Sequence, residues 1–65
     1  MSRYKIEWMP ADENVWEDTF QYTDDLTNAI RVAKAWKRGL FCYDKPKDAR
    51  VVDRIENKII EVQED

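Results

Sequence analysis

Apolar and polar side chains follow two different periods along this chain, and each change of period marks a new element. Between Asp24 and Arg38 the apolar residues recur every three or four positions, which predicts an amphipathic helix over this segment. The apolar stripe consists of Leu26, Ala29, Ile30, Ala33, Trp36 and Leu40, with Val32 at its edge. The opposite side carries polar and basic residues, so we expect the helix to lie on an apolar support with its other side in water.

Both ends of this helix carry recognisable signals. Thr23, Asp24 or Asp25 can cap the free amides of the first turn, and the two aspartates suit the positive end of the helix dipole. Gly39 is the only glycine in the chain and follows the last helical residue. We expect a left-handed backbone conformation there, because glycine adopts it with little strain.

An alternation of apolar and polar residues precedes the helix, clean in Tyr4–Met9 and interrupted at Asp18 in the next segment. It predicts a half-buried strand over Tyr4–Met9 and a second strand over Val15–Tyr22. The apolar side of the first strand consists of Tyr4, Ile6 and Trp8. In the second strand, Trp16, Phe20 and Tyr22 share a face with Asp18. The second strand therefore either bulges or places Asp18 near an edge. We expect the two strands to form an antiparallel hairpin whose aromatic face covers the helix.

The segment after the helix is first apolar and then polar. Leu40–Tyr43 is the most apolar run in the chain, and we expect Leu40 and one or two of its neighbours to be buried against the sheet. Residues 44–48 are rich in charge and centre on Pro46, which is typical of a turn or an exposed loop.

The last two predicted strands are Ala49–Asp53 and Ile59–Gln63, joined by a turn over Arg54–Lys58 in which Asn57 is the expected left-handed residue. Each strand contains two adjacent branched apolar residues, and adjacent residues of a strand point to opposite faces. These residues are Val51, Val52, Ile59 and Ile60. Only one face can lie under a single helix, so we expect the other face to carry an apolar surplus.

The order of elements is therefore strand, strand, helix, strand, strand. It predicts an α+β protein with a two-layer ββαββ architecture, in which one helix packs across one face of an antiparallel four-stranded sheet. A chain of 65 residues allows one small domain, residues 1–65, and three Trp, three Tyr and two Phe supply much of its apolar area. The order of the strands within the sheet stays open.

The single cysteine excludes an internal disulfide and favours a reducing compartment. No apolar run approaches the length of about 20 residues that a membrane-spanning helix needs. The N-terminal residues also lack the apolar core of a signal peptide. We therefore expect a cytoplasmic protein that does not enter a membrane.

Charge is distributed unevenly around a net value of −3. Residues 1–27 contain seven acidic and two basic side chains, whereas residues 28–58 contain nine basic and four acidic ones. This segregation predicts two oppositely charged patches, unless folding interleaves the two halves.

The chain lacks the residues on which most catalytic and metal sites depend. It has no histidine and one cysteine, which excludes a zinc site of the usual kind, and its single glycine excludes a P-loop or a dinucleotide-binding turn. Ser2 is the only serine, and Cys42 has no imidazole to activate it. We therefore predict that the protein is not an enzyme and holds no cofactor and no metal.

The apolar surplus predicts a protein-binding module that engages a partner protein, or a second copy of itself as a homodimer, through a sheet face or an edge strand. The predicted binding residues are Val52, Ile59, Phe41 and Tyr43. In size and arrangement the chain resembles many small bacterial and phage proteins, and small phage proteins often bind and redirect a host enzyme. The resemblance therefore favours partner binding.

The alternative is a nucleic-acid-binding module. A basic ridge on the polar side of the helix and in the following loop, interleaved with aromatic residues, is a pattern that contacts phosphates and stacks on bases. Its residues are Arg31, Lys34, Arg38, Lys45 and Lys47. Against it, the chain is acidic overall, with a pI near 4.9.

Overall fold

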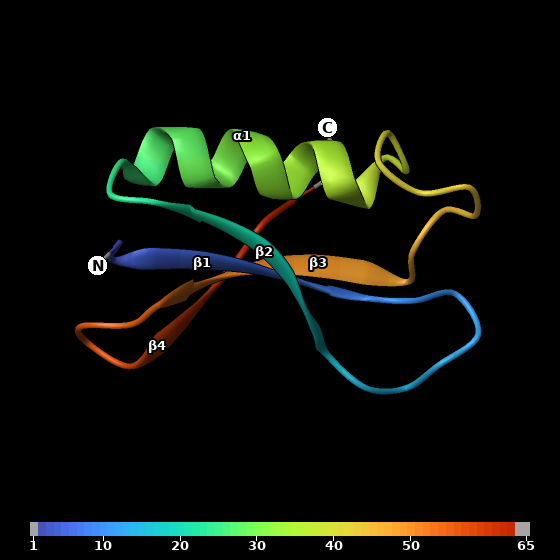
Figure 1. Cartoon of the computed structure of the whole chain (residues 1–65), viewed down its shortest axis with the longest axis horizontal. Coiled ribbons are helices and arrows are strands. Elements are labelled where there is room, and N and C mark those ends of the chain that lie inside the picture. The colour runs from blue at the N-terminus through green and yellow to red at the C-terminus, as the bar shows by residue number, and fades with distance from the viewer. Residues whose placement is uncertain (1, 64–65) are drawn as a thin grey trace.

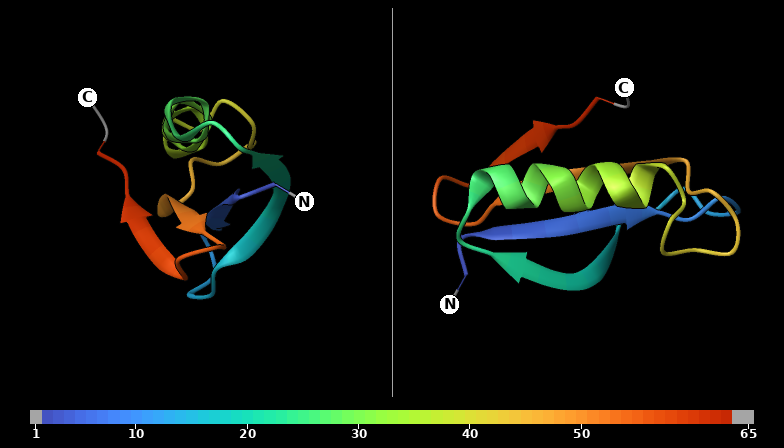
Figure 2. Two further views of the ribbon diagram at one scale, coloured as in Figure 1. Left: turned by 90° about the vertical axis from the view of Figure 1, so that its left-hand side faces the viewer. Right: turned by 90° about the horizontal axis from the view of Figure 1, so that it is seen from above.

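The computed structural model describes residues 2–63, which form one helix on a four-stranded antiparallel sheet (Figure 1). The elements are β1 (Tyr4–Met9), β2 (Glu17–Thr23), α1 (Leu26–Lys37), β3 (Asp48–Asp53) and β4 (Lys58–Glu61). The strand order is β2-β1-β3-β4, so the two hairpins join edge to edge through β1 and β3. Seen along the sheet, α1 covers one face and leaves the other uncovered (Figure 2). The predicted two-layer α+β class is confirmed.

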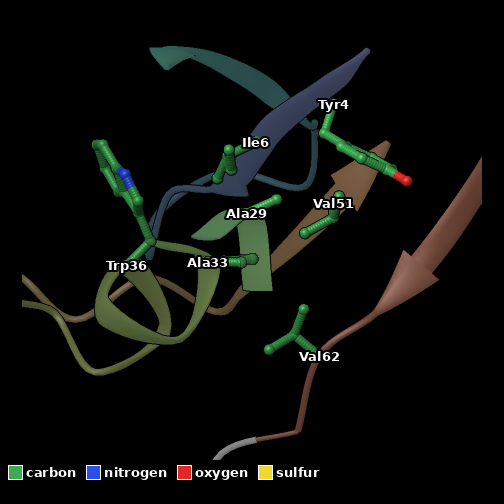
Figure 3. Close-up of a cluster of buried hydrophobic side chains, with 8 residues drawn as sticks. Tyr4, Ile6, Ala29, Ala33, Trp36, Val51 and Val62 are labelled. Atoms are coloured by element: carbon green, nitrogen blue, oxygen red, sulfur yellow. The ribbon is translucent and has the colours of Figure 1, made fainter. Parts of the chain in front are cut away.

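The two central strands carry the strand half of the core. They pair over six residues, from Tyr4 opposite Asp53 to Met9 opposite Asp48, which places Ile6 directly opposite Val51. Ile6 and Val51 are at most 1% exposed, and their side chains point toward α1 (Figure 3). Burial of branched side chains on both strands at one point stabilises this pairing and fixes its register.

The helix contacts this core through small residues. Ala29 and Ala33 are fully buried, and Trp36 closes the same stripe one turn later. Because alanine has no bulk beyond Cβ, the helix backbone approaches the sheet closely, and the buried stripe of the helix is narrow. The expectation that Leu26 belongs to the buried stripe is wrong. Leu26 is the first residue of α1, lies outside the buried alanine stripe and is 38% exposed.

The predicted capping residue at the start of the helix and the predicted left-handed glycine after its end are both confirmed. Asp25 is the N-cap, and its Oδ1 accepts a hydrogen bond from the backbone N–H of Thr27 at 3.0 Å. At the other end Gly39 has φ +81°, its N–H donates to the carbonyl of Trp36, and the N–H of Leu40 donates to that of Ala35. These two bonds define a Schellman motif, which turns the chain away from the helix axis.

The second strand departs from its prediction because it bulges. Lys5 lies opposite Tyr22 and Glu7 opposite Asp18, so a single β1 residue faces three residues of β2. Phe20, at the centre of the bulge, has φ 62° and is 78% exposed. The register puts Asp18 and Tyr22 on the face away from α1, and the expectation that the aromatic face of this hairpin covers the helix is therefore wrong for β2. It holds for β1.

Hydrogen bonds from side chains hold the bulge in place. The backbone N–H of Phe20 donates to Asp18 Oδ1 at 2.7 Å, and the N–H of Gln21 donates to Thr19 Oγ1. Thr19 in turn donates to the carbonyl of Ile6 on β1. Asp18 therefore has the structural role of bulge former, and because β2 is an edge strand, both alternatives left open by the alternation pattern hold.

The last hairpin matches its predicted faces and turn. Val52 and Ile59 are paired on the uncovered face, Val51 and Ile60 on the helix side, and Asn57 has the predicted left-handed conformation with φ 58°. The last strand, however, ends at Glu61 rather than at Gln63. Val62 leaves the sheet, is buried beside the helix, and its carbonyl accepts a hydrogen bond from Lys37 Nζ.

Candidate protein-binding site

Three large apolar side chains stand exposed at one end of the molecule. They are Leu40, Phe41 and Tyr43, with exposed fractions of 69%, 51% and 106%, and we refer to them as the aromatic end. They belong to the segment that joins α1 to β3, which extends past the ends of the strands (Figures 1 and 2). The prediction that Leu40 and one or two of its neighbours are buried is wrong for Leu40 and holds in part for Cys42, which is half-buried against the core. The Schellman turn carries the exposed part of this segment beyond the sheet, where no strand lies beneath it.

Three aromatic rings pack against one another beneath the aromatic end. Trp36 of α1 lies between Trp8 of β1 and Phe41, with 5.1 Å between ring centroids in both pairs and tilts of 36°. The indole N–H of Trp36 is buried without an acceptor in the described part of the chain. Ring packing rather than hydrogen bonding therefore fixes this side chain.

The segment that carries the aromatic end is anchored on both sides. Pro46 is buried, Cys42 packs against the core cluster, and the backbone N–H of Lys47 donates to the carbonyl of Met9 at 2.9 Å. At its start, a Cβ on Gly39 would lie 3.3 Å from the Cα of Lys45. Because its backbone is held at these points, the exposure of its apolar side chains is a feature of the folded structure.

Next to the aromatic end is a hollow of about 230 Å³. One wall comes from the end of β1 and the loop after it, and the other from the α1–β3 segment. The residues that line it are Trp8, Pro10, Ala11, Asp12, Cys42, Tyr43 and Asp44. The only charged side chains among them are those of Asp12 and Asp44, which are exposed and which we refer to as the acidic rim.

Further acids lie close to this rim. A hydrogen bond with Glu17 and the negative charges of Glu17 and Asp12 raise the pKa of Glu13. Like charges at close range disfavour the ionised form of a carboxyl group, so these three acids lie near one another. The loop between β1 and β2 is therefore a negatively charged flank of the aromatic end.

The thiol in the hollow is not activated. Burial raises the pKa of Cys42, so the thiol stays protonated at neutral pH. This agrees with the expectation that Cys42 lacks a group to activate it.

The four predicted binding residues fall into two separate places. Phe41 and Tyr43 belong to the aromatic end, whereas Val52 and Ile59 lie on the uncovered face of the sheet, toward the opposite ends of β1 and β3. The structure therefore brings together two residues of the set and keeps the other two apart from them. Leu40, Asp12 and Asp44 were not predicted, and the run Leu40–Tyr43 was the one signal that pointed to this segment.

The uncovered sheet face is occupied largely by side chains that bind one another. Arg50 forms an ion pair with Glu7 at 2.8 Å and its guanidinium lies 4.0 Å from the centre of the Trp16 ring. Tyr22 donates to Asp18 Oδ2 at 2.7 Å. Acidic and basic side chains from the two halves of the sequence thus pair on this face, and these pairs leave few of its polar groups available to a ligand.

A second hollow, of about 220 Å³, lies where β4 diverges from β3. Its basic groups are already engaged: Lys37 pairs with Asp48 at 3.2 Å, and Arg50 with Glu7. It therefore offers fewer groups to a ligand than the hollow beside the aromatic end.

The predicted basic ridge is only partly available. Arg31 and Arg38 are exposed on the solvent side of α1, but Lys34 and Lys45 are engaged in other interactions, and Lys47 donates to Asn14 Oδ1 at 2.6 Å. The prediction of nucleic-acid binding stays a prediction.

Residues 2–63 contain no cluster of three or more side chains able to hold a metal ion, and no helix among them is long and apolar enough to cross a membrane. Comparison with models of known protein families, with curated proteins and with solved structures finds no match.

Proposed function

We propose that this protein is a non-catalytic protein-binding module whose binding surface is the aromatic end. The observation that supports this most is the exposure of Leu40, Phe41 and Tyr43 on a segment with an anchored backbone. Exposed apolar side chains are common one at a time, but here three lie within four residues of one short segment, and apolar surface concentrated in this way is typical of sites of contact with other proteins.

The energetics of the patch favour contact with a partner. Transfer of one large apolar side chain from water to a packed interface contributes about 1.5–3 kcal/mol. The stack beneath Phe41 is already ordered, so a partner that covers this ring needs to immobilise little of the protein. Large aromatic side chains on an ordered support are typical of the residues that dominate binding energy.

The uncovered sheet face fits this role less well. Ile59 is 54% exposed, but its surroundings are ion pairs and ring–guanidinium contacts within the protein. A partner at this face would have to displace or desolvate charges that are already satisfied, which offsets much of the gain from apolar contact.

A peptide-display selection on the full chain tests the proposal. Peptides enriched on the wild-type protein are measured for binding to Tyr43→Ser and to Ile59→Thr, which removes an exposed apolar side chain from the sheet face. We expect Tyr43→Ser to weaken binding at least tenfold and Ile59→Thr to change it less than twofold.

Circular dichroism confirms that each variant is folded before binding is compared. Peptides that lose affinity on Ile59→Thr and not on Tyr43→Ser would move the site to the sheet face and contradict the proposal. A selection that yields no peptide dependent on Tyr43 would contradict it as well.

A further inference from the structure

The hollow beside the aromatic end is chemically distinct from the patch itself. Its lining combines two rings, Trp8 and Tyr43, with two carboxylates, Asp12 and Asp44. Neither carboxylate has a hydrogen bond or an ion pair with another residue in the described part of the chain. Ring faces and unpaired carboxylates both attract cations.

The nearby lysines of the protein itself do not neutralise Asp12 and Asp44. Lys47 donates a hydrogen bond to Asn14, and neither Lys45 nor Lys47 lines the hollow. The neighbouring Glu13 and Glu17 add negative charge to the same side. A positively charged group that arrives from outside would therefore meet complementary charge.

The size of the hollow indicates what kind of group fits. Sites for drug-sized ligands usually enclose about 300–1,000 Å³, and this hollow of about 230 Å³ is smaller. It matches one long side chain better than an independent small molecule.

A second copy of the chain is a poor occupant. In a two-fold dimer through the aromatic end, the same surface faces itself, so the acidic rims of the two copies would approach each other. Like charges brought together across an interface oppose association. The charge pattern thus favours a different protein over self-association.

We propose that the partner presents a segment of apolar residues that includes a lysine or arginine, and that this basic side chain enters the hollow between Asp12 and Asp44 while the apolar residues cover Leu40, Phe41 and Tyr43. The inference rests on the proposed function, because it names the chemistry of the partner at the same site.

The peptides selected on the full chain supply the probe. We expect them to be enriched in lysine or arginine next to aromatic or aliphatic residues and depleted in aspartate and glutamate. We expect Asp12→Asn and Asp44→Asn each to weaken the binding of such a peptide about tenfold. The control Glu61→Gln removes an exposed acid elsewhere and should leave affinity within twofold.

Replacement of the basic residue of the peptide by norleucine keeps its apolar stem and removes its charge. We expect the same loss, with no further loss when the norleucine peptide is tested on Asp12→Asn/Asp44→Asn. Affinity of the basic peptide should also fall with ionic strength, whereas that of the norleucine peptide should not.

The outcomes separate the two proposals. Peptides that depend on Tyr43 but carry acidic residues, or no basic residue, or that ignore both aspartate variants, would overturn the inference and leave the proposed function standing. Peptides that do not depend on Tyr43 would overturn both.

Discussion

The two ends of the sheet are built in opposite ways. At the turn end, which comprises the β3–β4 turn and the adjoining Arg3, a buried carboxylate organises the chain: Asp53 is 3% exposed, pairs with Arg3 at 2.8 Å, and accepts hydrogen bonds from the N–H groups of Ile55 and Glu56. Ile55 is the one large apolar side chain of this turn that is exposed. At the aromatic end, apolar side chains are exposed, and the nearby Asp12 and Asp44 have no ion pair among residues 2–63.

This difference separates stability from recognition. At the turn end Arg3 and Asp53 are partners of each other within the chain, and this pairing is sufficient reason for their presence. At the aromatic end Tyr43, Asp12 and Asp44 have no such partner among residues 2–63, and their removal should leave the fold intact. Substitutions at the two ends should therefore affect different measurements.

The largest expected effect is the loss of stability in Asp53→Ala. This change leaves two backbone N–H groups without their acceptor and removes from Arg3 the closer of its two carboxylates, the other being Glu56 at 3.4 Å, and we expect it to lower Tm by about 10 °C. Asp53→Asn keeps an acceptor for the turn and should recover part of the loss. Thermal unfolding followed by circular dichroism measures both, and a Tm unchanged in Asp53→Ala would show that the turn end is not the stabilising one.

The same carboxylate predicts how stability depends on pH. Its hydrogen bond with Arg3 is the main reason that the pKa of Asp53 is lowered from 3.8 to about 2. The carboxylate binds its proton more readily in the unfolded chain, so its contribution is complete above pH 3.8 and is lost as pH falls toward 2. Urea unfolding of the wild type should show a steeper loss of stability over this window than that of Asp53→Asn. Equal slopes would argue against the ion pair.

A smaller effect is expected where the helix meets the aromatic segment. Gly39→Ala places a Cβ at φ +81° and 3.3 Å from the Cα of Lys45, and should lower the free energy of unfolding by about 1 kcal/mol. Gly39→Asn, which tolerates this conformation better, is the matched comparison, and urea unfolding measures both. Equal stability of wild type and Gly39→Ala would indicate that this turn is not held in the left-handed conformation.

The smallest effect on stability belongs to the aromatic end itself. Leu40→Ser and Tyr43→Ser should change the free energy of unfolding by less than about 0.5 kcal/mol, because neither side chain is packed. The same two variants should weaken peptide binding. A substantial loss of stability in either would mean that these residues belong to the core after all.

Local sequence patterns predicted most of the architecture. The alternation of Tyr4–Met9, the helix stripe around Ala33, and the left-handed residues Gly39 and Asn57 depend on neighbours in the chain, and all of them are confirmed. The order of the strands depends on contacts between distant segments, which no local pattern contains.

The candidate site was only half predictable, for a related reason. The sequence marks Leu40–Tyr43 as apolar, and apolar runs are usually buried. Whether a run is buried depends on what lies beneath it. Here the helix ends near the end of the sheet, so no strand lies beneath the residues that follow it. The acidic rim could not be predicted, because Asp12 and Asp44 are 32 positions apart and meet only in the folded chain.

The most direct test of the account is an NMR titration of the isotope-labelled full chain with a peptide selected on it. We predict that the largest backbone shift changes fall on residues 10–14 and 40–44, on both sides of the acidic hollow, with the uncovered sheet face around Val52 and Ile59 unchanged. Shift changes centred on Val52, Ile59 and Trp16, or along the solvent side of α1, would contradict it.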